Sequence, residues 1–202
     1  MAVVQQTTRV RQSRRESRER IVTAATELVR RRAYAELSVD AVMREAGIGR
    51  TIFYRHFDDL ADLLLRVSRE AVEELFEAQS SFVQSRPGDA TDAVRRALEA
   101  AVEVYRRHGP LLRCMAEAAA GDEQIAGGYA AMRRRFDDFA EQSLREVAGL
   151  GQTTPSNLAE TARALNLMNE TYLTDAFGRE PRVAPETAVQ TLTEIWDAVI
   201  RR

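Results

Sequence analysis

One stretch of twenty residues, SVDAVMREAGIGRTIFYRHF at positions 38–57, constrains the fold more than any other part of the sequence. Ser38 is a suitable N-cap for a helix that ends at Gly47, which stands where a left-handed C-cap belongs. The apolar residues of this helix recur at helical spacing and are Val39, Val42 and Met43. A second helix must follow, since apolar residues repeat again at Ile52, Phe53 and Phe57. The pattern predicts two short helices joined by a tight turn.

Polar side chains lie between the apolar positions of the second helix and are expected to face outward. They are hydrogen-bond donors of the kinds that contact phosphate oxygens and base edges in the major groove of DNA. Two helices joined in this way form a helix-turn-helix, whose second helix enters the major groove. The residues predicted to contact DNA are Ser38, Arg44, Arg50, Thr51, Tyr54, Arg55 and His56.

Two segments carry a resemblance to a known family. Residues 46–50, AGIGR, followed by 53–57, FYRHF, resemble the signature of TetR-type transcriptional repressors. Farther along, residues 164–170, ALNLMNE, together with Ala176-Phe177 and Ile195-Trp196, resemble the end of an EthR-type ligand domain of that family. The resemblance implies an all-α repressor with an N-terminal DNA-binding domain and a larger domain for effector binding and dimerisation.

Three positions depart from the common family pattern. Gly49 stands where the family commonly has Ser, and Ile52 stands where it commonly has Thr, so two hydroxyls that could contact phosphate are lost. Leu60 replaces a lysine that usually contacts the DNA backbone. We expect these changes to alter the operator sequence and the affinity rather than the mode of binding.

Charge is distributed unevenly along the chain. The net charge is −2, but residues 1–57 hold 12 arginines against 6 acidic residues, which gives +6 for this part and −8 for the rest. A basic N-terminal part on an acidic body is expected when only one end of a protein meets DNA. Residues 1–13 are predicted to be a flexible basic arm that contacts DNA, because they combine polar residues with arginine; the alternative is a solvated tail.

The apolar periodicity predicts an all-α protein of about nine helices. Ser13 and Glu16 form a possible capping box that would start the first helix. A turn is predicted at Pro87-Gly88-Asp89, Gly109-Pro110 is predicted to separate two helices, and the next long helix is predicted to begin at Tyr129. The predicted domains are an arm at 1–13, a helix-turn-helix domain at 14–58, and an effector-binding and dimerisation domain at 59–202.

A pair of amides suggests a second site. Asn166 and Asn169 share one face of an apolar helix, where an unpaired amide costs about 1–3 kcal/mol. They could bond to the backbone, face solvent or bind a ligand, and the EthR-type resemblance implies the last. The predicted ligand is small, elongated and apolar with one or two polar atoms. The predicted ligand-binding residues are Ala97, Ala101, Tyr105, Met115, Phe139, Asn166, Asn169 and Trp196.

Enzymatic chemistry has little support in the sequence. The two histidines, His56 and His108, are far apart, and Cys114 is the single thiol. His56 is better placed as a phosphate contact, and no group of His, Cys or Asp has metal-ligand spacing. We therefore expect no catalysis, metal or cofactor. The single cysteine and the absence of an apolar run of about 20 residues favour a cytoplasmic protein without a membrane segment. The predicted DNA binding would associate it with the nucleoid.

The sequence predicts a homodimeric repressor. Two recognition helices must lie one or more helical turns of DNA apart, about 34 Å each, to contact a palindromic operator. In the family, the last two long helices form the dimer interface, here about residues 156–177 and 186–201. An activator remains an alternative, and so does a helical carrier whose basic end binds a protein or a membrane surface.

Overall fold

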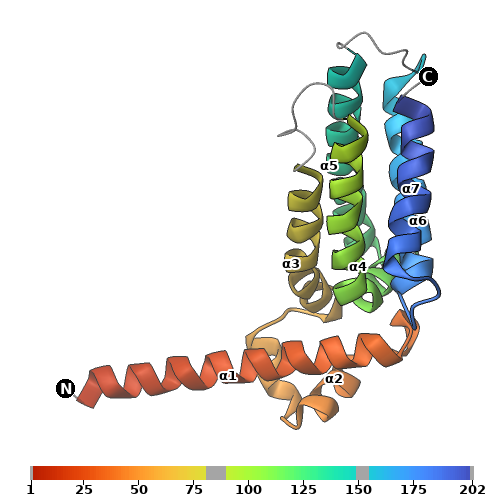
Figure 1. Cartoon of the computed structure of the whole chain (residues 1–202). Helices are drawn as coiled ribbons and strands as arrows, with labels where there is room; N and C mark the ends of the chain where they lie inside the picture. The colour runs from red at the N-terminus through yellow and green to blue at the C-terminus, as the bar shows by residue number, and fades with distance from the viewer. Residues whose placement is uncertain (1, 81–89, 149–154, 201–202) are drawn as a thin grey trace.

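The computed structural model describes residues 2–80, 90–148 and 155–200, and within them it contains helices and no strand. This confirms the predicted all-α fold. Helices α3 to α7 stand side by side as a bundle, and α1 lies across one end of it with α2 against its outer side (Figure 1). The elements are α1 Ala2–Arg31, η1 Tyr34–Glu36, α2 Val39–Ala46, η2 Arg50–Arg55, α3 Leu60–Ser80, α4 Ala90–Ala119, α5 Glu123–Ala148, α6 Leu158–Phe177 and α7 Pro185–Ile200, where η denotes a 3₁₀ helix.

The predicted caps of α2 are present. The Ser38 hydroxyl accepts a hydrogen bond from the backbone N–H of Ala41 at 3.1 Å, and Gly47 has φ of 65°, a left-handed conformation that favours glycine. Arg20 of α1 donates to the carbonyls of Ala46 and Gly47, which lack partners within α2. The N-terminal core beneath these caps consists of Ile21, Ala24, Ala25, Leu28, Val42, Met43, Ala46, Phe53, Phe57 and Leu63.

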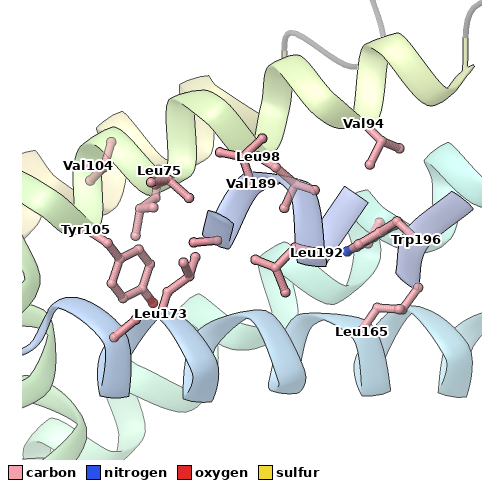
Figure 2. Close-up of a cluster of buried hydrophobic side chains, with 14 of the residues drawn as sticks. Leu75, Val94, Leu98, Val104, Tyr105, Leu165, Leu173, Val189, Leu192 and Trp196 are labelled. Carbon is pink, nitrogen blue, oxygen red and sulfur yellow. The ribbon is translucent and has the colours of Figure 1, made fainter. Parts of the chain in front are cut away.

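The bundle has its own core, in which α4, α6 and α7 contribute most of the side chains (Figure 2). Leu98 on α4 and Leu192 on α7 are among the buried side chains, as is Leu173 on α6. Each such leucine removed from water contributes about 1.5–3 kcal/mol. The core therefore fixes α4 against the two C-terminal helices. Helix α4 also contributes Leu111, Cys114, Met115 and Ala118 to the cluster next to α1, so it runs from one end of the bundle to the other.

The prediction of a break at Gly109-Pro110 is wrong, because α4 continues through both residues as one helix. Gly109 has a different reason for being glycine. A Cβ atom at this position would lie 2.2 Å from the carbonyl oxygen of Phe177 on α6. Glycine thus allows two helices to approach closely, where the sequence suggested a helix end.

Other helix boundaries also differ from the predictions. Helix α1 begins at Ala2 rather than at Ser13, so the backbone of residues 2–12 is helical. Helix α5 begins at Glu123 rather than at Tyr129, because Asp122 accepts a hydrogen bond from the Ile125 N–H at 3.1 Å and caps it. The turn predicted at 87–89 lies outside the described residues.

None of the helices within the described ranges is long and apolar enough to span a membrane.

Candidate functional site

The predicted DNA-contacting surface is built on η2. Phe53 is fully buried beneath it, and the ring of Tyr54 meets that of Phe53 edge to face with 5.4 Å between centroids. Tyr54 itself is 53% exposed, the most exposed large apolar side chain in the part of the chain that the structure describes. A rigidly supported aromatic ring that faces water presents its polar hydroxyl where DNA can contact it.

Arg50 organises this surface from the start of η2. One of its terminal nitrogens lies 2.9 and 3.0 Å from the two carboxylate oxygens of Asp40 on α2. The other donates to the Tyr54 hydroxyl at 3.1 Å. Arg50 and Asp40 are both more than half exposed, so solvent screens this ion pair and it adds little to stability. Its effect is to hold Tyr54 in one orientation.

His56 is less exposed than expected. Its Nε2 atom lies 2.9 Å from the hydroxyl of Ser17 on α1, so the side chain ties η2 to α1. Burial lowers the pKa of His56 below its ordinary value of 6.5, and the nearby charges of Arg14, Arg18 and Arg55 lower it further. At neutral pH His56 is therefore uncharged in the free protein. Besides being a predicted DNA contact, it holds η2 in place against α1.

The other predicted contacts are also accessible to solvent. Arg44, Thr51 and Arg55 are exposed, and so is Ser38, whose hydroxyl already accepts the capping bond of α2. That hydroxyl can still donate its hydrogen. The seven predicted residues thus come from two adjacent elements, α2 and η2, over one core.

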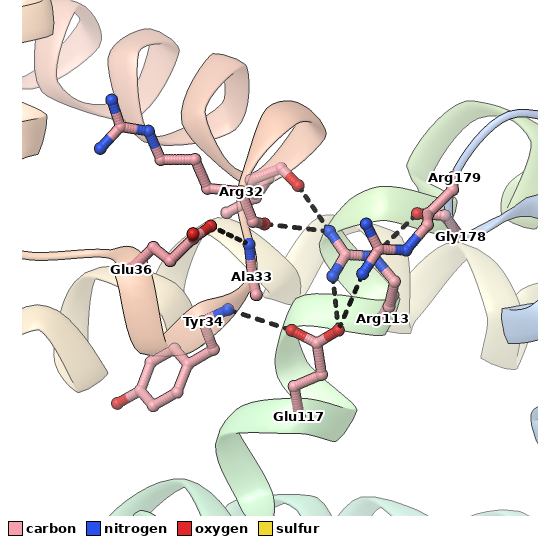
Figure 3. A network of polar contacts seen from close by, with 9 residues as sticks. Arg32, Ala33, Tyr34, Glu36, Arg113, Glu117, Gly178 and Arg179 are labelled. Carbon is pink, nitrogen blue, oxygen red and sulfur yellow. Dashed lines mark hydrogen bonds and ion pairs between the residues drawn. The ribbon is translucent and has the colours of Figure 1, made fainter.

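A buried arginine joins the helix-turn-helix to the bundle (Figure 3). Arg113 on α4 is 7% exposed, and its guanidinium donates to the carbonyls of Val29 and Arg32 at the end of α1, at 2.9 and 3.1 Å. It also donates to the Gly178 carbonyl after α6 at 2.9 Å and to Glu117 at 2.5 Å. One side chain therefore satisfies the end of α1, the end of α6 and a carboxylate of α4.

Glu117 completes this junction. Its second carboxylate oxygen accepts a hydrogen bond from the Tyr34 N–H of η1 at 3.0 Å. Burial alone would raise the pKa of Glu117, but the bonds from Tyr34 and Arg113 and the positive charges of Arg113 and Arg179 outweigh it and lower the pKa. Glu117 stays ionised at neutral pH and holds η1 against α4.

Among the described residues, two cavities of the bundle are lined by predicted ligand-binding residues. The first, of about 90 Å³, is lined by Leu75, Gln79, Ala101, Tyr105, Leu112, Tyr129, Met132, Arg133, Phe136, Asp137, Asn166, Asn169, Glu170 and Leu173. The second, of about 70 Å³, is lined by Gln79, Val94, Ala97, Leu98, Ala101, Phe139, Ala140, Ser143, Asn169 and Trp196. Because Gln79, Ala101 and Asn169 line both, the two cavities adjoin.

The structure brings all of the predicted ligand-binding residues except Met115 to these two cavities. Met115 faces a separate cluster with Cys114 and Ile125, near the helix-turn-helix. Met115 is therefore not among the residues that line these two cavities. The unbroken helix turns Met115 to the side that packs under α1 and α3.

Both asparagines are hydrogen-bonded to other side chains. From the sequence, only the backbone, solvent or a ligand had been considered as their partners. Asn166 donates to Asp137 on α5 at 2.9 Å, and the Asn169 oxygen accepts a hydrogen bond from the Trp196 indole at 3.3 Å. Sequence reasoning missed Asp137 and also missed Arg133 and Glu170, which form an ion pair at 3.0 Å in the same wall. Arg133 and Asp137 are four residues apart on α5 and so share one helix face, and this spacing was the sequence signal that could have indicated a polar wall.

The thiol and the second histidine are not arranged for catalysis. Cys114 is fully buried, and burial raises the pKa of its thiol to about 12, so the thiolate needed for nucleophilic attack is absent at neutral pH. His108 lies beside Glu74, 3.5 Å from its carboxylate. Neither group lines the cavities described above.

The fold and the exposed surface define a helix-turn-helix transcriptional regulator. Two family models match the chain: Bacterial regulatory proteins, tetR family, over residues 21–67, and Transcriptional regulator EthR, C-terminal domain, over residues 94–201. The HTH-type transcriptional regulator EthR of Mycolicibacterium smegmatis is 30% identical over 180 residues, which cover 87% of this chain and 82% of that protein. The chain therefore belongs to the TetR family and has a C-terminal domain of the EthR type.

Another curated relative and two solved structures are similar to this chain. EthR of Mycobacterium tuberculosis strain H37Rv is 26% identical over 181 residues, covering 87% of this chain and 83% of that one. Among solved structures, the TetR family regulator PfmR from Thermus thermophilus superimposes with a TM-score of 0.72 at 20% identity, covering 90% of this chain and 97% of that one. A TetR-like regulator from Rhodococcus sp. RHA1 gives 0.71 at 18% identity, covering 92% and 97%. At these identities the two structures support the fold alone.

Proposed function

We propose that this protein is a homodimeric repressor that binds a palindromic operator and releases it when a small effector occupies the two adjoining cavities. One observation carries the proposal: α4 lines both cavities with Ala101 and, through Arg113, holds the end of α1. A shift of α4 on ligand binding would therefore move the helix-turn-helix. We place this activity at the nucleoid, where operators lie.

The DNA contact surface follows from η2. Tyr54, Thr51 and Arg55 would contact the major groove, and Ser38 and Arg44 would contact phosphates beside it. Because Gly49 leaves open space around its Cα, the operator backbone could approach the start of η2 closely. We assign residues 14–58 to this domain and 59–202 to the effector and dimerisation domain, with 1–13 as a basic extension of α1.

The dimer would form through α6 and α7. Ile195 on α7 is 39% exposed, an unusual position for isoleucine, and Ala198 beside it is also exposed. On α6, the exposed Ala164 and Thr171 continue a surface of small side chains. Such a surface permits close approach of helices from a second copy and would bury Ile195.

Release requires that the effector prefer one conformation. A ligand with equal affinity for the DNA-bound and free shapes would shift nothing, and a ligand that moves the balance from 1:99 to 99:1 must prefer one shape about 10⁴-fold. We assign the switch to the Arg113 junction, because one guanidinium holds the ends of both α1 and α6 and a shift of α4 would change these hydrogen bonds at the same time.

The experiment selects bound duplexes from a random DNA library with the purified protein and then scores ligands by release. The proposal expects a two-fold symmetric sequence to be enriched, and expects compounds that raise the melting temperature to release it. Enrichment without any symmetry would contradict the dimeric operator. Recruitment of polymerase to the enriched site in a transcription assay, instead of blockage, would make the protein an activator.

A further inference from the structure

The two adjoining cavities differ in character. The second cavity is mostly apolar. Two of its polar side chains are already paired, since Ser143 donates to the Phe139 carbonyl at 2.9 Å and the Trp196 indole donates to Asn169. The first cavity has charged side chains in its wall. A ligand that occupies both must therefore be polar at one end and apolar at the other.

The polar cavity carries more negative than positive charge. Glu170 is matched, because Arg133 forms an ion pair with it at 3.0 Å and the Tyr129 hydroxyl donates to it. Asp137 has only the neutral amide of Asn166 as a hydrogen-bond donor at 2.9 Å, and no cationic side chain pairs with it among the described residues. The wall thus holds one half-buried carboxylate without a counter-charge.

A second acceptor in the same wall has no partner. The side-chain oxygen of Gln79 on α3 is buried and makes no hydrogen bond within the described structure. A buried acceptor left unpaired is unfavourable, and in native proteins such an atom is commonly satisfied by an ordered water or a bound ligand. Gln79 lines both cavities, so this oxygen belongs to the junction between the polar and apolar ends.

We propose that the effector is an amphipathic amine. Its protonated head would lie in the first cavity and donate hydrogen bonds to the Asp137 carboxylate, which lacks a cationic partner, and to the Gln79 oxygen, which lacks a donor. Phe136 lines the same wall and adds an aromatic ring beside the head group. The apolar chain would pass Ala101 and Asn169 into the second cavity, toward Trp196. This inference rests on the proposed effector role of the cavities.

The structure disfavours the opposite charge. A ligand carboxylate in the first cavity would meet Asp137 and Glu170 with a single guanidinium, Arg133, that Glu170 already engages. Like charges brought together in a partly buried site repel, and the acceptors would remain unpaired. A neutral alcohol could donate one hydrogen bond and would rank between the two.

The test compares three probes that share one chain and differ in the head group: n-octylamine, n-octanol and octanoate. Binding to the purified full-length protein without DNA is measured by calorimetry at pH 7. Octylamine is expected to bind about tenfold or more tightly than octanol, which is the usual gain from a charge-assisted hydrogen bond, and octanoate is expected to bind most weakly. Equal binding of the amine and the alcohol, tighter binding of octanoate, or no binding of any probe would overturn the proposal.

Matched variants locate the effect. Asp137→Asn keeps an acceptor for Asn166 but removes the charge, so the preference for octylamine should disappear while octanol binding stays unchanged. Octanol binding also reports that the variant is folded. Asp138→Asn, the next residue on α5, changes the same charge at an exposed position and should leave the preference intact. An Asp137→Asn protein that still prefers the amine tenfold would contradict the assignment.

Failure of this inference can be told apart from failure of the proposed function. If octylamine binds as predicted but does not release the operator, the chemistry of the cavity is right and the effector role is wrong. If a neutral or acidic compound releases the operator while octylamine does not bind, the regulator function stands and the amine assignment fails.

Discussion

Replacing Arg113 with methionine should destabilise the protein more than the same change at any exposed arginine. The variant keeps an unbranched apolar stem but removes the guanidinium, which donates to the carbonyls of Val29, Arg32 and Gly178 and to the Glu117 carboxylate. Removing one partner of a buried charged pair costs about 3–5 kcal/mol, mainly because the remaining groups are left unpaired. That is at least about a fifth of the 5–15 kcal/mol typical of a whole domain.

The assay is urea unfolding followed by circular dichroism, at one fixed protein concentration because a dimer's stability depends on it. Arg106→Met on the same helix is the matched control, since Arg106 is exposed and pairs only with nearby Glu103; its midpoint should hardly change. Arg113→Lys keeps the charge but not the planar fork, and should fall between them. An Arg113→Met midpoint equal to that of Arg106→Met would refute the account of the junction.

Three further predictions follow from single features of the structure. Tyr54→Ala should weaken operator binding measured by anisotropy about tenfold or more, which corresponds to about 2 kcal/mol of binding free energy. Thermal unfolding should change little because the ring is exposed. Unchanged affinity would remove Tyr54 from the interface. Gly109→Ala should destabilise by more than the usual gain of helix propensity, since its Cβ would lie 2.2 Å from the Phe177 carbonyl; a rise in melting temperature would disprove this close contact. The lowered pKa of Glu117 stabilises the folded protein above pH 4.5, the ordinary pKa of glutamate, and this stabilisation is lost as pH falls through the lower pKa of the folded state. The stability of Glu117→Gln should therefore depend less on pH in this acidic range. Identical pH profiles of the two proteins would contradict the ionised junction.

Local features of the fold were predictable because their causes lie within a few residues of one another. Ser38 and Gly47 cap the two ends of α2 as expected, since an N-cap hydroxyl and a left-handed glycine each act on the adjoining turn of their own helix. The same holds for Phe53 and Phe57, whose spacing places them in the core. Errors arose where a residue serves a distant partner. Gly109 is glycine because of Phe177, and local rules interpret it as a helix end.

The candidate sites divide in the same way. Asn166 and Asn169 stood out because amides on an apolar helix face need partners, and both line the first cavity. Asp137 and Arg113 did not stand out, because charged residues on helices usually face solvent. Arg113 acquires its role from the Val29 carbonyl, 84 residues away in sequence, and no pattern within one helix reveals such a contact.

The most direct test of the central claim is DNA binding itself. Fluorescence anisotropy would follow titration of the purified protein into labelled DNA from the intergenic region upstream of its own gene, with scrambled DNA as competitor, at two salt concentrations. The account predicts binding that scrambled DNA does not displace and that weakens steeply as salt rises, because arginines release counterions from phosphates. Binding that falls with salt but is displaced equally by scrambled DNA, there and across a wide duplex library, would contradict sequence-specific regulation by this helix-turn-helix.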